Sequence, residues 1–183
     1  QFCEDTSSAC PQGSPATAYF NIAVTSPQQA QIIEFSSPGT NSATTIAGGE
    51  IVSQAQLNFG SGNGNLSGAY SFDFSGISSS GAEQSVVGEF VANGHGTISP
   101  GSSTAPLAPG EMDINTNGAL SKTAIARTSY VISSNGRGTV TLNGLTFSFY
   151  PISVGRAKFI EIDAPAAPAT TPDSILVGEA YIQ

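Results

Sequence analysis

The segments Ala18–Ser36 (AYFNIAVTSPQQAQIIEFS) and Leu145–Asp163 (LTFSFYPISVGRAKFIEID) align with each other without a gap. Each holds two short apolar runs on either side of a polar turn, which is the pattern of a β-hairpin. The two segments have the same residue at five aligned places: Phe20/Phe147, Ser26/Ser153, Ala30/Ala157, Ile33/Ile160 and Glu34/Glu161. This repeat predicts that one β-structure occurs twice in the chain.

A second pair of blocks follows these hairpins, because 46–50 (IAGGE) and Gln54 match 175–179 (ILVGE) and Gln183. The chain therefore divides into a Cys-containing loop at 1–17, a partial repeat at 18–56 and a complete repeat at 57–183. The strand edges of a partial β-unit must be covered by something. What covers them is the functional question that this sequence raises.

The rest of the chain alternates short Val, Ile, Phe and Tyr runs with Gly and Asn, which indicates an all-β protein. Asn-Gly pairs at 93, 117, 135 and 143 supply the positive φ angles of hairpin turns, and the pair at 63 predicts a flexible join. No helix is expected. The predicted strands are 18–25, 30–36, 49–57, 67–75, 86–92, 96–99, 111–115, 123–133, 137–142, 145–153, 156–163 and 174–182. We expect an antiparallel meander that forms either a β-barrel or a two-layer β-sandwich, with extra N-terminal strands from the partial repeat.

Charge and hydropathy exclude two classes of partner. Residues 1–121 contain nine acidic residues and no basic one, and the net charge of the chain is −8. Nucleic-acid binding needs clusters of Lys and Arg, so it is not expected. No apolar stretch approaches the ~20 residues of a membrane span. The uneven charge fits a solvated acidic surface, or an attraction between the acidic and weakly basic faces of neighbouring copies.

Cys3 and Cys10 lie close together in a polar terminal loop. A metal site would need more ligands nearby, and the only histidine is His95. We therefore predict a local disulfide, which implies an oxidising compartment and a secreted protein at the cell surface.

The stretch 113–118 (DINTNG) matches the first half of a calcium loop, with Asp113, Asn115 and Asn117 as ligands. The acid that should close such a loop falls at Ala124, so the competing interpretation is a plain hairpin turn. Calcium is the only cofactor that the sequence suggests.

No catalytic motif is present. His95 follows a predicted turn and has no nucleophile in a recognisable pattern. The acids repeated between the two units (Glu34 and Glu161, Glu50 and Glu179) are expected to be outward or cross-strand structural residues. We predict that the protein is not an enzyme, and a surface glycan stays open as a partner.

Four stretches resemble a repeat of secreted, β-rich tandem-repeat proteins of acidobacteria: 66–72 (LSGAYSF), 88–90 (GEF) with Asn93-Gly94, 112–115 (MDIN) and 135–139 (NGRGT). The resemblance covers 57–183 fully and 18–56 as a partial copy, whereas 1–17 departs from it. It implies exported tandem β-units without an assigned enzymatic activity, and it assigns no catalytic residue.

These observations favour an extracellular structural subunit that assembles head to tail into a homo-oligomer or homopolymer by β-strand addition. The predicted assembly residues are Phe20, Ile22, Val24, Ile32, Ile33, Phe35 and Ile51. One alternative is a monomeric 11- or 12-stranded domain for adhesion or ligand binding. Another is a carrier with a ligand inside a barrel, although Tyr70, Phe72, Phe74, Phe147 and Phe149 would fill a small barrel.

Overall fold

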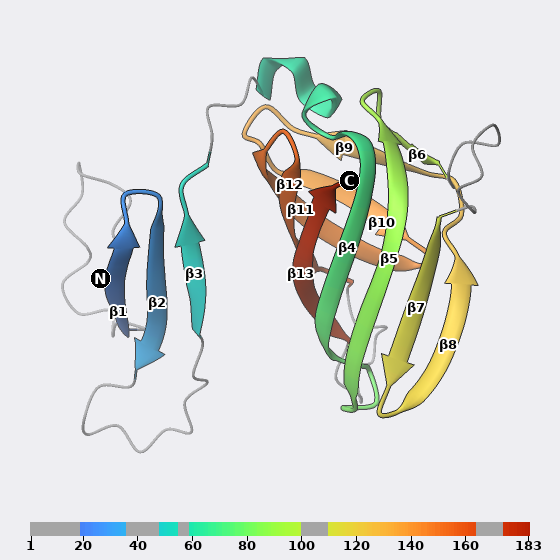
Figure 1. Cartoon of the computed structure of the whole chain (residues 1–183), viewed down its shortest axis with the longest axis horizontal. Helices are drawn as coiled ribbons and strands as arrows, with labels where there is room; N and C mark the ends of the chain where they lie inside the picture. The colour runs from blue at the N-terminus through green and yellow to red at the C-terminus, as the bar shows by residue number, and fades with distance from the viewer. Residues whose placement is uncertain (1–18, 36–47, 55–58, 100–109, 164–173) are drawn as a thin grey trace. The chain divides into compact units, whose positions relative to one another are not determined.

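The computed structural model describes residues 19–35, 48–54, 59–99, 110–163 and 174–183, and it confirms the all-β prediction (Figure 1). A single short 3₁₀ helix in these residues, η1 (Phe59–Asn65), was not expected from the sequence. The strands are β1 (Tyr19–Ser26), β2 (Gln29–Phe35), β3 (Gly48–Val52), β4 (Ser67–Ile77), β5 (Glu83–Asn93), β6 (Thr97–Ser99), β7 (Glu111–Thr116), β8 (Ala119–Ala124), β9 (Thr128–Ile132), β10 (Gly138–Leu142), β11 (Leu145–Ser153), β12 (Arg156–Glu161) and β13 (Ile175–Ile182). The chain forms two compact units, Gln1–Ser53 and Gln54–Gln183.

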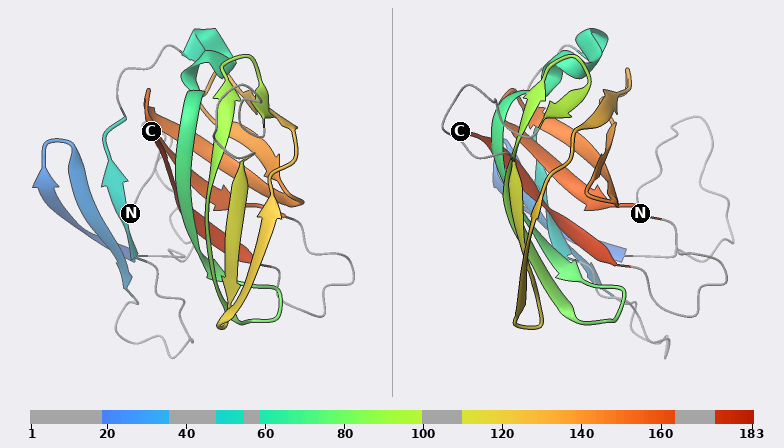
Figure 2. Two further views of the ribbon diagram at one scale, coloured as in Figure 1. Left: turned by 45° about the vertical axis from the view of Figure 1, so that its right-hand side comes forward. Right: turned by 90° about the vertical axis from the view of Figure 1, so that its right-hand side faces the viewer.

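The second unit is a closed barrel of eight antiparallel strands, not a sandwich (Figure 2). Its strand order is β4-β13-β12-β11-β10-β9-β6-β5, and pairing of β4 with β5 closes the ring. The β7–β8 hairpin stands outside this ring, because β7 pairs with residues 84–88 of β5 while β6 pairs with 91–92. Closure gives each barrel strand two neighbours, which removes the exposed edges of an open sheet.

Aromatic side chains fill the barrel. The five residues predicted to do so are all at most 4% exposed: Tyr70, Phe72, Phe74, Phe147 and Phe149. Phe72 stacks on Phe74 with 4.7 Å between ring centroids, and Phe149 stacks on Phe159 at 5.2 Å. Side chains thus occupy the interior where a carried ligand would have to bind.

Glycines on the barrel wall make room for these rings. A Cβ atom at Gly138 would lie 2.2 Å from Cζ of Phe149, and one at Gly178 would lie 2.7 Å from Cδ1 of Phe74. Neither distance is possible between real atoms, so each ring packs directly on main chain. Gly138 of β10 and Gly178 of β13 are therefore parts of the core packing.

The helix η1 is attached to one end of the barrel, which contradicts the expected flexible join at Asn63. Asn63 Oδ1 accepts a hydrogen bond of 2.8 Å from Ile132 N, and Asn63 O accepts one of 2.9 Å from the Tyr130 hydroxyl. The Tyr130 hydroxyl also donates to Leu66 O at 2.5 Å. A buried hydroxyl needs such partners, and η1 and the residue directly after it supply them.

The predicted strand 123–133 is wrong, because the structure has two strands there. β8 ends at Ala124 and β9 begins at Thr128, and the buried side chain of Ile125 marks the break. Most of β8 lay outside the prediction because its side chains are almost all exposed and show no apolar alternation. The expected strand 49–57 also ends early, at Val52.

The Asn-Gly turns differ from one another. Both residues have positive φ at Asn117 (49°) and Gly118 (87°), and at Asn143 (54°) and Gly144 (92°), as two-residue hairpin turns require. In the pairs that begin at 93 and 135, only the glycine has positive φ. The prediction of a two-residue turn is therefore met at two of these four sites.

The glycine beneath Phe149 provides a test of the barrel core. We expect Gly138→Ala to lower the free energy of unfolding by about 1–3 kcal/mol, because the added methyl group forces the ring from its place. Gly155→Ala is the matched control, since its methyl group would meet only the side chain of Ile182, which is 46% exposed and can move. Urea unfolding of both variants measures the difference, and an equal loss in the two would contradict this packing.

Candidate functional site

The first unit is a three-stranded antiparallel sheet in the order β1-β2-β3, and it is separate from the barrel sheet. This arrangement contradicts a single domain of 11 or 12 strands. The β1–β2 hairpin has the same register as the β11–β12 hairpin, and both have an irregularity at the same place. The register shifts between Val24 and Ser26 in the first hairpin and between Pro151 and Ser153 in the second.

The next pair of strands agrees in the same way. Gln31 lies opposite Glu50 in the β2–β3 pair, as Lys158 lies opposite Glu179 in the β12–β13 pair. All five residue pairs of β2–β3 have such a counterpart in β12–β13. The sheet β1–β3 thus has the strand order and register of one part of the barrel, β11–β13.

The main-chain bonds at the end of the sheet match too. Ser53 N donates to Gln28 O at 2.7 Å, and at the equivalent place Ile182 N donates to Gly155 O at 2.8 Å. The sequence repeat therefore encodes the main-chain geometry as well as the side-chain pattern.

The face of β1–β3 that corresponds to the barrel interior is exposed at several of its described residues. Ile22 and Val24 stand where β11 has the buried Phe149 and Pro151, yet they are 43% and 77% exposed. Ile51, which corresponds to the fully buried Ala180, is 41% exposed. In the barrel, the equivalent face is covered by the other strands of the ring.

The remaining predicted assembly residues divide between the two faces. Ile32 is half-buried, and the neighbouring Ile33 is 52% exposed on the opposite face, as alternation along a strand requires. The side chains of Phe20 and Phe35 lie outside the described residues. The structure thus places four of the five described assembly residues at largely exposed positions.

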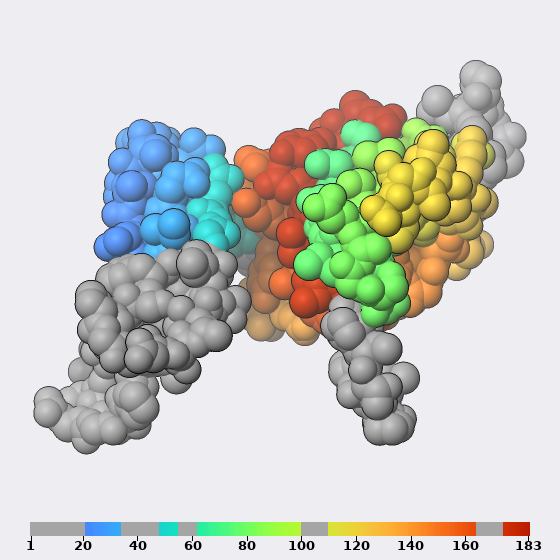
Figure 3. Space-filling model, turned by 90° about the horizontal axis from the view of Figure 1, so that it is seen from below, coloured from blue at the N-terminus to red at the C-terminus, as the bar shows by residue number. Residues whose placement is uncertain are grey.

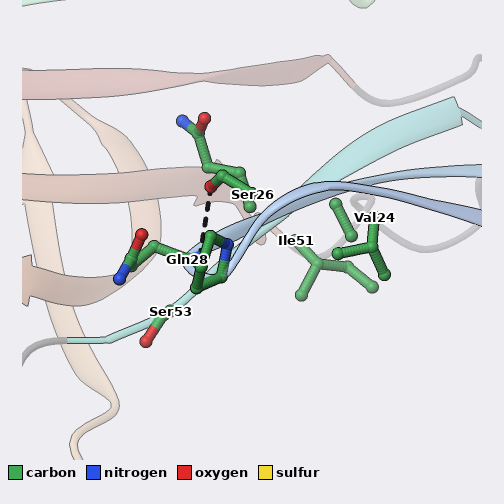
Figure 4. A pocket seen from close by; sticks show the side chains of 8 residues that line it. Val24, Ser26, Gln28, Ile51 and Ser53 are labelled. Atoms are coloured by element: carbon green, nitrogen blue, oxygen red, sulfur yellow. Dashed lines mark hydrogen bonds between the residues drawn. The ribbon is translucent and has the colours of Figure 1, made fainter.

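A shallow hollow of about 210 Å³ lies on this sheet (Figure 4). It is lined by Val24, Ser26, Pro27, Gln28, Gln29, Ala30, Ile51 and Ser53. In the barrel the equivalent place holds the ring of Tyr70. Tyr70 lies opposite Ile182, the counterpart of Ser53, and its hydroxyl donates to O of Val154, the counterpart of Pro27, at 3.0 Å. The hollow therefore corresponds to a position that an aromatic side chain of β4 fills in the complete ring.

The outer face of β12–β13 carries a charge network that β2–β3 has only in part. Arg156 donates to both carboxylate oxygens of Glu179 at 2.7 and 2.8 Å, and Nζ of Lys158 lies 3.2 Å from the same carboxylate. Glu50 stands at the place of Glu179, but the positions of the two cations are Gln29 and Gln31. Strand β2 thus supplies no cation to the outer face of its sheet.

The predicted calcium ligands belong to the β7–β8 hairpin. Asn115 Oδ1 accepts a bond of 2.8 Å from Gly118 N inside the hairpin turn, and Asp113 lies opposite Lys122. Within the described residues no group of three or more His, Cys, Asp or Glu side chains is placed to hold a metal ion. Calcium binding at this turn stays a prediction. Cys3 and Cys10 lie outside the described residues.

Of the two positions expected for the repeated acid Glu161, outward or cross-strand, the structure shows the second. Glu161 is 6% exposed and accepts bonds of 2.6 Å from the Ser174 hydroxyl and 3.0 Å from Leu176 N. These bonds tie β12 to the start of β13, so the role of Glu161 is structural. His95 is exposed, as expected, and its N donates to Asn93 Oδ1 at 2.8 Å.

The outer edge of β8 is a feature that sequence reasoning missed. β8 is the last strand in the barrel sheet, and its Leu120 is 79% exposed. The Asn-Gly turn at 117 was the signal that could have placed a strand directly after it. Among the described residues no helix is long and apolar enough to cross a membrane.

The network around Glu179 predicts a dependence of stability on pH. Burial would raise the pKa of Glu179, but hydrogen bonds from Arg156, Tyr181 and Lys158 outweigh it and lower the pKa from 4.5 to about 2. A lowered folded-state pKa stabilises the fold above the unfolded value, and this contribution is lost as the pH falls from 4.5 towards 2. We expect Glu179→Gln to cost about 1–2 kcal/mol at pH 7, after allowance for solvent screening.

The difference in free energy of unfolding between wild type and Glu179→Gln should become smaller as the pH falls over the same range. Urea unfolding at pH 7, 4, 3 and 2.5 measures it, with the exposed Glu83→Gln as the control for removal of one acid. A difference that is constant with pH would contradict the assigned ion pairs.

Comparison of the chain with known protein families, with characterised proteins and with solved structures finds no match.

Proposed function

We propose that the chain is a structural subunit of an extracellular assembly, in which copies join head to tail by β-strand addition through the sheet β1–β3. The observation that carries this proposal is the identity of register between β1–β3 and β11–β13. A sheet of this kind is stable in the barrel because the other strands cover its apolar face and pair with its edges. In β1–β3, that face is exposed at Ile22, Val24 and Ile51.

The physical reason for association follows from this exposure. Burial of apolar surface stabilises an association by roughly 25 cal/mol for each Å² removed from water. Edge strands also offer unpaired main-chain groups to a partner. A contact between two different surfaces of the same chain continues from copy to copy unless its rotation closes a ring. The expected product is a filament or a surface matrix.

The barrel fits a structural role better than a carrier role. Its interior is packed with aromatic rings that are almost completely buried, from Tyr70 to Phe159. The alternative of a monomeric adhesion domain would leave the apolar face of β1–β3 without a function. Secretion and the Cys3–Cys10 disulfide belong to the same proposal and rest on the sequence alone.

Val24 allows a direct test of self-assembly. We expect Val24→Lys to abolish association while the fold survives, because this side chain is 77% exposed in the single chain but buried in the proposed contact. Val154→Lys is the matched control, since Val154 is 71% exposed on the barrel. Sedimentation velocity and electron microscopy of the purified chain measure the assembly, with and without a calcium chelator to test the calcium prediction.

Filaments of wild type and of Val154→Lys, together with dispersed particles of Val24→Lys, would support the proposal. Assembly of Val24→Lys at the wild-type level would show that the apolar face of β1–β3 is not buried in the contact. A wild-type chain that stays monomeric at all concentrations would refute self-assembly and favour the adhesion alternative.

A further inference from the structure

We propose that the acceptor in this assembly is the outer edge of β8, which pairs with β3 of a second copy so that Glu50 lies opposite Lys122. The inference rests on the proposed self-assembly and names the two strands that meet. It would continue the three-stranded sheet of one copy into the β5–β7–β8 part of the next.

Strand addition needs an acceptor strand with a free edge, and barrel closure leaves few. Each of the eight ring strands has a neighbour on both sides. β8 pairs with β7 on one side and is the end strand of the barrel sheet in the described part of the chain. Figure 3 shows the β7–β8 hairpin (yellow) at the surface of the barrel.

The main-chain N–H groups of a strand point alternately to its two sides. Ile125, directly after β8, donates its N–H to Gly110 O on the β7 side at 2.7 Å. By alternation, the N–H groups of Leu120, Lys122 and Ala124 point to the outer edge.

The same argument applies to β3. Ser53, directly after this strand, donates its N–H to Gln28 O on the β2 side at 2.7 Å. The N–H groups of Gly48, Glu50 and Val52 therefore point away from β2. In an antiparallel pair, residues whose N–H groups point at the partner strand lie opposite one another. Glu50 can thus lie opposite Lys122, and neighbouring pairs follow without a bulge.

The side chains agree with this register. Lys122 is exposed on the outer face of β8, and Glu50 occupies the outer-face position that Glu179 has in β13. The barrel already contains this kind of pair, because Lys158 lies directly opposite Glu179 with 3.2 Å between their charged atoms. The next pair in register brings Val52 beside Leu120, whose side chain is 79% exposed.

The local charges of the two strands favour the contact, because β3 has Glu50 and no basic residue while β8 has Lys122 and no acid. Residues 19–53 contain two acids, Glu34 and Glu50, and no basic residue. Lys122 binds Glu111 at 2.5 Å, but an ammonium group has three donors and can hold a second carboxylate. A shift of the register by two residues would place Glu50 opposite Leu120 or Ala124 and lose the ion pair.

On the opposite face, Ile51 meets a small side chain of β8. In the proposed register Ile51 lies opposite Ser121, and Ser121 lies opposite the partly buried Ile114 of β7. The uncovered face of β1–β3 would therefore continue into the inner face of the β7–β8 hairpin. The turn between β10 and β11 reaches β8 through Asn143 Nδ2, which donates to the Thr123 hydroxyl at 2.8 Å. Because this contact uses a side chain of β8, it does not occupy the main-chain groups at the outer edge.

Charge reversal at the two positions tests the proposal in the full chain. Glu50→Lys would place a second ammonium group opposite Lys122, and Lys122→Glu would place a second carboxylate opposite Glu50. We expect each variant alone to associate at least about 10-fold more weakly than wild type in sedimentation velocity, because like charges are then opposed. An equimolar mixture of the two variants should assemble again, since the β3 strand of one variant then meets an opposite charge on β8 of the other.

Glu83→Lys and Arg137→Glu are the matched controls, because they make the same kind of charge change at other exposed sites. We expect both to assemble like wild type, and thermal unfolding of each variant checks that the barrel is intact.

Three results would overturn the inference, and they are distinguishable. Assembly of both reversal variants at the wild-type level would reject β8 as the acceptor and leave the proposed function standing. If the chain that carries both reversals assembles but the mixture of single variants does not, the pair forms within one chain. A wild-type chain that does not associate would refute the proposed function together with this inference.

Discussion

The pairing of strand edges is the constraint on which the rest of this structure depends. The eight-stranded ring satisfies it by joining β4 to both β13 and β5. The β7–β8 hairpin and the sheet β1–β3 satisfy it only in part, because each ends in a strand with one neighbour. The two features of the described chain on which the proposed assembly depends are therefore the two places where pairing is incomplete.

Packing inside the ring follows from closure. A small barrel has room for side chains only, and this one is filled by stacked Phe and Tyr rings that rest on glycine main chain. The register of the strands decides which glycine faces which ring. Core packing and strand pairing are therefore coupled, so that a shift of one strand would place rings against rings and glycine against solvent.

Sequence patterns predicted the all-β class, the core aromatics and most strands, because alternation and Asn-Gly turns are local signals. They could not choose between barrel and sandwich, since closure depends on the pairing of β4 with β13, which are far apart in the chain. They missed most of β8 because its exposed side chains give no alternation, and they left open whether Glu161 points outward or bonds across strands. The repeat between 18–36 and 145–163 led to the proposed assembly residues, whereas the unpaired outer edge of β8 in the described chain is visible only in the structure.

The equal register of β1–β3 and β11–β13 also has a consequence for folding. During synthesis β1–β3 is made first, so the strands β4–β10 meet a sheet of the right geometry before β11–β13 exists. Where β11 and β12 have Phe149 and Phe159, the earlier sheet has the smaller Ile22 and Ile32. A barrel closed by β1–β3 in place of β11–β13 would hold cavities. The strands β11–β13 would displace β1–β3, because their larger side chains fill these cavities. The larger rings of β11 and β12 therefore favour a ring closed by β11–β13 over one closed by β1–β3.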